Sequence, residues 1–557
     1  MPPRSALRRI GSRPTAPLDA DARPLLSSRV AFERAADGST WVAIVDGVPS
    51  SRLSAAVVDL LTAMNGQTSL RELHLRFAAS EPTDSFLALI QRFRASGLLA
   101  GEARRPPGRL VYRPPLTVQV ATLRAPALFD RLNRLTVPLP RRAVLPVIAG
   151  LLALGVIAAS AQWPVLRTAL ASPMPLSALV SVVAALAFLT LVHESAHGIT
   201  LTRFGGSPRR AGFMLFYLTP AFFVDVTDGW RLSDRRQRVA IALAGPAVHA
   251  VVAALGLLGA LLIREPAVRE TLVFLSTACA AIVVVNLIPF VRFDGYLALM
   301  SALDEPNLRA RTIRDAAQFL ARVLFGGRPS TKTVDTWWSV PFGLASLLTP
   351  VILVAFAVVR ISRALAGGGP ILGLVVVAVE AAVLVVGIVL VSRALTRILR
   401  SGVSRLRFVA VLTTLATAAV IVGAVVPVPV TATFGFVARG DRVALVQAGH
   451  DTDVRVPEDA RVVLVTNGIL TNDRIGDGTV TLQRPEPTEV PLDALFPVTA
   501  ADVTIPAVIV AEVRVSEGSG DVPPVGQARI ELGTRNVWQT LWMAGVVSPL
   551  STFRSEK

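Results

Sequence analysis

The sequence predicts a polytopic α-helical membrane protein with a small α+β domain before the membrane part and a β-rich domain after it. Three observations support this fold class. The 557 residues are 52% hydrophobic with a mean hydropathy of +0.57, a balance typical of chains that cross a bilayer several times. Seven apolar runs are long enough to span the bilayer. After Val430, short alternating runs separated by turn residues indicate β-strands.

The chain begins with a basic segment and a small domain. Residues 1–27 are rich in arginine and proline and are predicted to form a disordered tail. They hold no apolar stretch of the signal-peptide type, so the N-terminus is expected in the cytoplasm. Within residues 28–103, alternation in Thr40–Val45 followed by Asp46-Gly47 predicts a hairpin. Three helical patterns follow, at Leu53–Ala63, Leu70–Ala79 and Ser85–Ala95.

This order of strands and helices resembles the winged-helix peptide chaperones of pyrroloquinoline quinone biosynthesis. Related domains serve as leader-recognition elements for ribosomally made, modified peptides (RiPPs). The resemblance covers about 75 residues and rests on the pattern, not on a signature motif. It implies that residues 28–103 bind a leader peptide as an added strand along the hairpin around Thr40–Pro49. A generic winged helix, DNA binders included, is the alternative, and attachment to a membrane argues against DNA.

A Pro/Arg-rich linker, residues 104–143, is predicted to lead into a membrane core of residues 144–430. Arginines such as Arg209, Arg311 and Arg400 crowd alternate loops, whereas the intervening loops are short and poor in charge. The positive-inside rule then predicts a cytoplasmic N-terminus and an extracytoplasmic C-terminus. The expected location is a bacterial-type plasma membrane. The seven predicted spans are about 144–163, 176–200, 239–263, 271–291, 339–359, 370–392 and 407–429.

The charge distribution also bears on partners. The whole chain has a net charge of +17, but residues 431–557 hold 11 basic and 16 acidic residues. The basic excess therefore reflects membrane topology, and no nucleic-acid partner is expected. Residues 431–557 are predicted to be an extracytoplasmic β-rich domain without a catalytic constellation. The single cysteine, Cys279, excludes structural disulfides within the chain.

One motif, His193-Glu194-Ser195-Ala196-His197, lies near the end of an apolar run. Two imidazoles at i and i+4 share one helix face and can reach a single metal ion, with Glu194 beside them as candidate general base. The preceding stretch, Leu176 to Leu191, carries no charge. An ionisable cluster at membrane depth indicates a functional site.

Zinc sites of this kind need a third protein ligand. The fourth predicted span ends in a segment from Asn286 to Gly295, at the same membrane depth as the two histidines because spans two and four run in one direction. Pro289 breaks the helix, which lets Asp294 turn back as the natural third ligand. Gly295 would supply a tight turn and Asn286 a hydrogen-bond donor. Four further residues stay open. Asp225 and Asp228 are competing ligands, and His249 either packs or hydrogen-bonds to a neighbouring helix or binds metal. Glu380 either makes a structural hydrogen bond or handles substrate or protons.

Together, H-E-x-x-H and N-x-x-P-x-x-x-x-D-G resemble the site-2 protease family of intramembrane zinc metalloproteases, over about residues 176–300. The resemblance implies a Zn²⁺ ion, Glu194 as general base and Asn286 as a substrate- or oxyanion-positioning group. It also implies that Gly212–Val226 is a re-entrant, sheet-like segment that pairs with an unwound substrate. The implied zinc ligands are His193, His197 and Asp294.

The whole layout is similar to the peptide zinc metalloproteases of peptide natural-product clusters, the daptide type among them. The expected function is thus cleavage of a peptide bond in a ribosomally made precursor at the membrane. The expected partners are its leader peptide, the lipid bilayer and, as a possible third, an ABC exporter. The alternatives are a non-proteolytic export or immunity protein with a vestigial metal site, and regulated cleavage of a membrane-anchored signalling protein.

Overall fold

The structure is a computed structural model whose chain folds into two compact units. One unit comprises residues 1–138 with 190–245, and the other comprises residues 139–189 with 246–557. The described residues are 19–34, 40–45, 48–100, 110–113, 117–122, 124–136, 141–216, 219–305, 307–326, 334, 336–365, 370–400, 403–439, 442–449, 456–482, 485–516 and 522–547. Most of the predicted basic tail and the predicted Asp46-Gly47 turn therefore lie outside them.

The first unit opens with the small α+β domain that the sequence predicts. Its three strands form an antiparallel sheet of order β1-β2-β3, and three helices follow. Helix α2 begins with a reciprocal capping box between Ser69 and Glu72, which explains its start. The elements are β1 (Val30–Arg34), β2 (Thr40–Val45), β3 (Val48–Ser54), α1 (Ala55–Thr62), α2 (Leu70–Phe77) and α3 (Thr83–Ala95).

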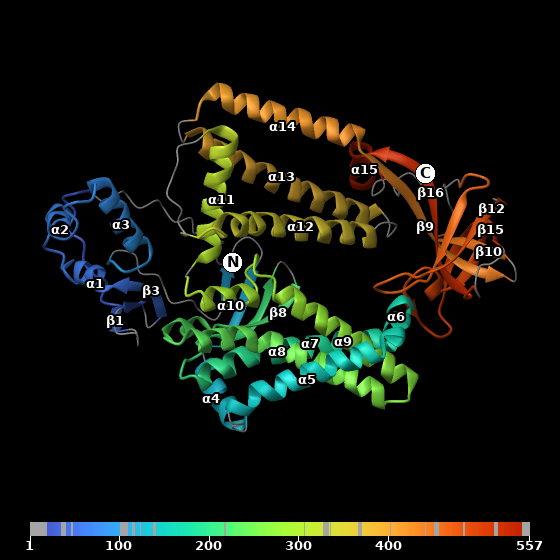
Figure 1. Ribbon diagram of the computed structural model, residues 1–557, viewed down its shortest axis with the longest axis horizontal. Helices are drawn as coiled ribbons and strands as arrows, with labels where there is room; N and C mark the ends of the chain where they lie inside the picture. Colours follow the sequence, from blue (N-terminus) through green and yellow to red (C-terminus); the bar gives the residue numbers. More distant parts are fainter. Residues whose placement is uncertain are drawn as a thin grey trace, which may run out of the picture. The chain divides into compact units, whose positions relative to one another are not determined.

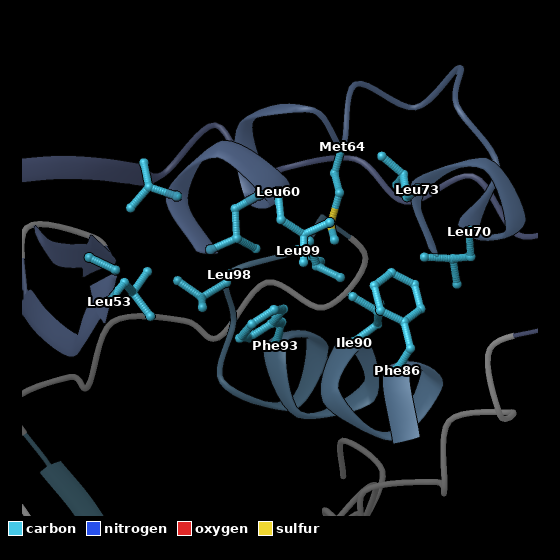
Figure 2. Packing of buried hydrophobic residues seen from close by; sticks show 13 residues of the cluster. Leu53, Leu60, Met64, Leu70, Leu73, Phe86, Ile90, Phe93, Leu98 and Leu99 are labelled. Atoms are coloured by element: carbon cyan, nitrogen blue, oxygen red, sulfur yellow. The ribbon is translucent and has the colours of Figure 1, made fainter. Parts of the chain in front are cut away.

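One hydrophobic core holds this domain together. Figure 2 shows Leu60, Met64 and Leu73 facing Ile90 and Phe93 of α3. Met64, Leu73 and Ile90 are fully buried. Removing each such side chain from water contributes roughly 1.5–3 kcal/mol, so this cluster gives the domain a core of its own.

Residues 104–143, expected to be a linker, contain two strands and a helix: β4 (Leu110–Arg113), β5 (Thr117–Thr122) and α4 (Ala125–Leu135). Strand β5 pairs with β7 (Ala211–Phe216), which pairs with β8 (Thr219–Val224), in a sheet of order β4-β5-β7-β8. The residues implied to be sheet-like are thus a β-hairpin. The alternation of Val with Thr and Gln favours a strand at β5. The surrounding prolines and arginines favour a linker, and this local composition hid the strand pattern.

Seven helices are long and apolar enough to cross a membrane, which confirms the predicted number of spans in the part of the chain that the structure describes. The protein is thus a multi-pass membrane protein by the length and composition of its helices. These helices are α5 (Arg141–Ala161), α7 (Leu176–Arg203), α8 (Arg235–Leu262), α9 (Pro266–Asn286), α12 (Ser339–Leu365), α13 (Pro370–Arg400) and α14 (Arg405–Val425). Figure 1 shows them labelled along the chain.

The β-rich domain after α14 is a closed six-stranded barrel. Its strands pair in the ring β10-β9-β16-β11-β12-β15, and β15 returns to β10 to close it. Strand β13 adds to the outside along β15. Phe436, Leu445 and Leu464 are fully buried in the barrel. The strands are β9 (Pro427–Arg439), β10 (Arg442–Ala448), β11 (Arg461–Val465), β12 (Arg474–Leu482), β13 (Glu486–Pro491), β15 (Thr504–Val515) and β16 (Val525–Asn536).

The barrel also holds the start of the helix that carries the histidine motif. The short strand β6 (Met174–Pro175) pairs in parallel with β14 (Val498–Thr499), and α7 begins at the next residue. Beside it, Arg167 of α6 (Trp163–Ala171) forms a salt bridge with Asp473, with Nε and Oδ2 3.1 Å apart. The strand pairing and the ion pair together attach this part of the chain to the barrel.

Candidate metal centre

Helix α7 places both motif histidines on one buried face. His193 and His197 lie one helical turn apart and are 7% and 5% exposed. Their Nε2 atoms are 3.3 Å apart. Two nitrogen ligands held about 2.0–2.1 Å from a tetrahedral zinc ion lie about 3.3–3.4 Å from each other. The spacing of the two imidazoles therefore fits two corners of such a site.

A backbone contact selects the ring nitrogen of His197 that can bind metal. Its Nδ1 lies 2.6 Å from the carbonyl oxygen of Ile241 in α8. A carbonyl only accepts hydrogen bonds, so Nδ1 is assigned the proton and Nε2 the lone pair. Such contacts also fix the orientation of a ligating imidazole.

A glycine of α8 makes room beside the two imidazoles. A Cβ added at Gly245 would lie 2.4 Å from Nε2 of His197 and 2.5 Å from Nε2 of His193. Any side chain at this position would enter the space in front of the ligating nitrogens. The cradle at Gly245 thus leaves space where an ion would sit.

The third candidate ligand lies where two helices nearly meet. Helix α9 ends at Asn286, and α10 (Asp294–Ala302) starts with Asp294 as its first residue. A Cβ at Gly295 would lie 2.4 Å from the carbonyl oxygen of Leu287. Gly295 therefore serves a close approach of α10 to the end of α9, whereas the expectation was a tight turn.

The structure brings His193, His197 and Asp294 together, with one ligand atom from each residue within 4.8 Å of the others. Both histidines are buried and the carboxylate is half-buried. Two imidazoles and one carboxylate form a donor set that suits Zn²⁺ and several other divalent ions. This group could hold a metal ion.

Glu194 lies next to His193 and is held by the hairpin. Its Oε2 accepts a hydrogen bond from the backbone N–H of Val224, the last residue of β8, at 3.1 Å. The next residue, Asp225, donates its N–H across the hairpin to the carbonyl of Arg210 at 2.8 Å. Because successive backbone groups of a strand point to opposite sides, Val224 directs its N–H toward the open side of β8. Glu194 therefore lies at the open edge of the sheet.

The other residues that the sequence suggested for the site lie outside the three-ligand group. Among the described residues, the three-ligand group contains neither Asp225 nor His249. Asp225 accepts a hydrogen bond from the N–H of Thr227 at 3.1 Å, and His249 is buried in α8. Asn286 is half-buried at the last residue of α9.

Asp228 belongs to an ion cluster instead. It is 4% exposed, accepts the N–H of Ser207 at 2.9 Å, and lies 3.6 Å from Arg231 and 3.8 Å from Arg209. Arg231 in turn donates to Glu33 of β1 at 2.6 Å, and this hydrogen bond raises the pKa of Arg231. Asp228 thus has structural partners that account for its burial.

An apolar cavity of about 590 Å³ opens beside α10. Its wall includes Phe290, from the turn before Asp294, and Leu299 of α10. Phe342 of α12 packs against Phe290 in a tilted arrangement, with ring centroids 5.2 Å apart. Arg309 fixes this wall, since its guanidinium donates to the carbonyls of Phe290 (3.0 Å) and Ser346 (2.9 Å). The lining suits an apolar group.

Comparison with protein-family models, curated proteins and solved structures finds no match to this chain. The fold and the geometry therefore carry the classification. They define a multi-pass membrane protein with a buried His-His-Asp group that could hold a metal ion.

Proposed function

We propose that the protein is an intramembrane zinc metalloprotease that cleaves a ribosomally made precursor peptide at the membrane. The observation that carries the proposal is the spacing of the two buried histidines, 3.3 Å between Nε2 atoms, next to Asp294 and Glu194. A buried ion-binding group on an apolar helix is costly to maintain and marks function. The carboxylate beside it supplies the group that peptide hydrolysis requires in addition to a metal.

In this proposal, a zinc ion held by His193, His197 and Asp294 would polarise the scissile carbonyl and lower the pKa of a bound water. Glu194 takes the proton of the attacking water and returns it to the leaving amine. Its hydrogen bond from Val224 orients the carboxylate for both transfers. Asn286 is proposed to position the substrate.

The edge of β8 supports a peptide as the substrate. β8 is the last strand of its sheet in the described residues, and its outward backbone groups lead to Val224 beside Glu194. By alternation, the backbone N–H of Phe222 points outward as well. Pro220 occupies the same kind of position but has no N–H, which is tolerated because the outer side of an edge strand is not used in the sheet. An unwound substrate pairing with β8 would bring its carbonyls to Glu194.

The ligand assignment predicts the metal content. Purified wild-type protein should contain about one zinc ion per chain, and His193→Ala or Asp294→Ala should lose it, since a three-residue set cannot spare a ligand. Metal content by mass spectrometry, per mole of folded protein, is the measurement. Asp225→Ala is the matched control and should keep its zinc. Full occupancy in Asp294→Ala would remove Asp294 from the site.

The activity itself is tested with purified protein in liposomes and a pool of membrane-inserting peptides. We expect new peptide N-termini that a zinc chelator abolishes and added zinc restores. Zinc-loaded protein that produces none would favour the export or immunity function.

We also propose that the N-terminal domain recruits the precursor's leader on the cytoplasmic side. Strand addition cannot occur along Thr40–Val45, because β2 is the central strand and pairs with β1 and β3 on its two sides. The leader would have to add to β1 or to β3. The position along the hairpin is thus corrected to the sheet edges, where backbone groups are unpaired.

Deleting residues 1–103 should weaken cleavage of a full precursor and leave a short peptide around the scissile bond cleaved at a similar rate. The physical reason is tethering, which raises the effective substrate concentration to the millimolar range for short linkers. Rates on the two substrates, compared at equal zinc content, provide the measurement. Equal losses on both would assign the domain a structural role, and salt-sensitive binding of duplex DNA would contradict leader recognition.

A further inference from the structure

The last described residues form an apolar segment next to two membrane helices. This C-terminal apolar segment comprises α15 (Val537–Trp542) and the π-helical turn η3 (Met543–Val547). With 11 residues it spans about 16 Å, which is half the hydrocarbon thickness of a bilayer. The segment is too short to cross a bilayer, but it is long enough to reach the bilayer midplane.

The C-terminal apolar segment starts at the level of the C-terminal end of α14. Strands β9 and β16 stay paired down to Pro427 and Asn536, directly after α14 and directly before α15. Trp538 donates its indole N–H to the carbonyl of Val420 at 3.2 Å. A Cβ at Gly423 would lie 2.2 Å from the same indole, so α14 is shaped for this contact. Figure 1 shows α15 beside the end of α14.

The segment ends against an acidic side chain inside a span. A Cβ at Gly545 would lie 2.9 Å from Oε2 of Glu380 in α13, and Ser362 donates to its Oε1 at 2.6 Å. An ionisable group in a span is expensive unless it has partners. Glu380 thus makes the structural hydrogen bond that was one of its two predicted roles, and the backbone at Gly545 covers its other oxygen.

Two depths agree. Glu380 lies ten residues after Pro370, or about 15 Å along α13, and Gly545 lies eight residues after Val537, or about 12 Å along its segment. The apolar part of α13 before Arg393 and the apolar part of α14 after Arg407 run in opposite directions, and each is about as long as a bilayer is thick. The start of α13 and the end of α14 are therefore assigned to the same membrane surface. Both groups therefore lie near the midplane from that surface.

The outward side of the segment is apolar. Trp538, Leu541 and Trp542 are 47%, 58% and 62% exposed, and the neighbouring helix α14 is apolar and mostly exposed. We propose that Val537–Val547 is a re-entrant half-helix that inserts into the hydrocarbon core of the bilayer down to Glu380. Its partner is the lipid interior, and the insertion anchors the barrel to the membrane at both ends.

Single-cysteine labelling tests this topology in the full-length protein in sealed liposomes. With the only native cysteine removed by Cys279→Ala, Leu541→Cys should react with a charged maleimide at least about tenfold more slowly than Leu470→Cys in the barrel. Apolar surroundings raise a thiol pKa, and each unit lowers the reactive thiolate tenfold. A lipid-soluble maleimide should label both. Equal rates with the charged reagent would overturn the proposal.

The Glu380 contact has its own test. Gly545→Leu should displace the segment and restore charged-maleimide labelling of Leu541→Cys, whereas Gly387→Leu on α13 should not, because nothing lies within 4 Å of a Cβ there. Should Gly545→Leu fail to fold, tryptophan quenching by lipids brominated near the chain ends replaces it. Quenching should fall when Trp542 is changed to Phe, and an unchanged signal would contradict insertion.

Discussion

Glu194→Gln is expected to keep its zinc and lose peptide cleavage by about two to four orders of magnitude, the usual cost of removing a general base. Glutamine preserves the shape of the side chain and can still accept the N–H of Val224, which lies 3.1 Å from the carboxylate. An amide cannot take up the proton of the attacking water. The loss should therefore appear in kcat, with KM and metal content close to wild type.

The measurement is single-turnover cleavage by protein matched for zinc content. Asp225→Asn makes the same carboxylate-to-amide change at the residue that directly follows β8 and should cleave normally. Near-normal turnover in Glu194→Gln would remove the proposed base and favour a protein in which the metal group has no catalytic part.

Gly245→Ala is expected to abolish metal binding through a single methyl group. The added Cβ would lie within 2.6 Å of ring atoms of both histidines, closer than any relaxed contact allows. The imidazoles would have to rotate, and His197 would lose its 2.6 Å contact with the Ile241 carbonyl. Zinc should fall from about one ion per chain to nearly none, with cleavage lost in parallel.

Gly259→Ala is a matched control on the same helix, because its Cβ would meet only the Leu272 side chain, at 3.4 Å. This variant should keep metal and activity. Both proteins should be compared by zinc content and by thermal unfolding, which separates a lost site from a lost fold. Full zinc occupancy in Gly245→Ala would contradict the proposed position of the ion.

The local sequence predicted the membrane class, the seven spans and the three residues that the structure groups together. These features follow from apolar length and from helical spacing. His193 and His197 share a face because they are four residues apart, and Pro289 disfavours continuation of α9 beyond Asn286. The barrel was predicted only as β-rich. Ring closure depends on pairing β15 with β10, and no local pattern encodes such a long-range register.

Other parts of the site came only from the tertiary structure. Three backbone features line the site: the Ile241 carbonyl and the Gly245 cradle on α8, and the Val224 N–H on β8. They lie about 30 to 50 residues from His193 in the chain, and no local sequence pattern links them to the motif. Strand β5 was concealed in a presumed linker because its partner β7 is some ninety residues away. By itself, the sequence determined which side chains could bind a metal ion, since ligand chemistry and helical spacing are local properties. Only the packing of distant backbones decided which ring nitrogen of His197 can bind an ion, how much room an ion would have, and where the proposed base is held.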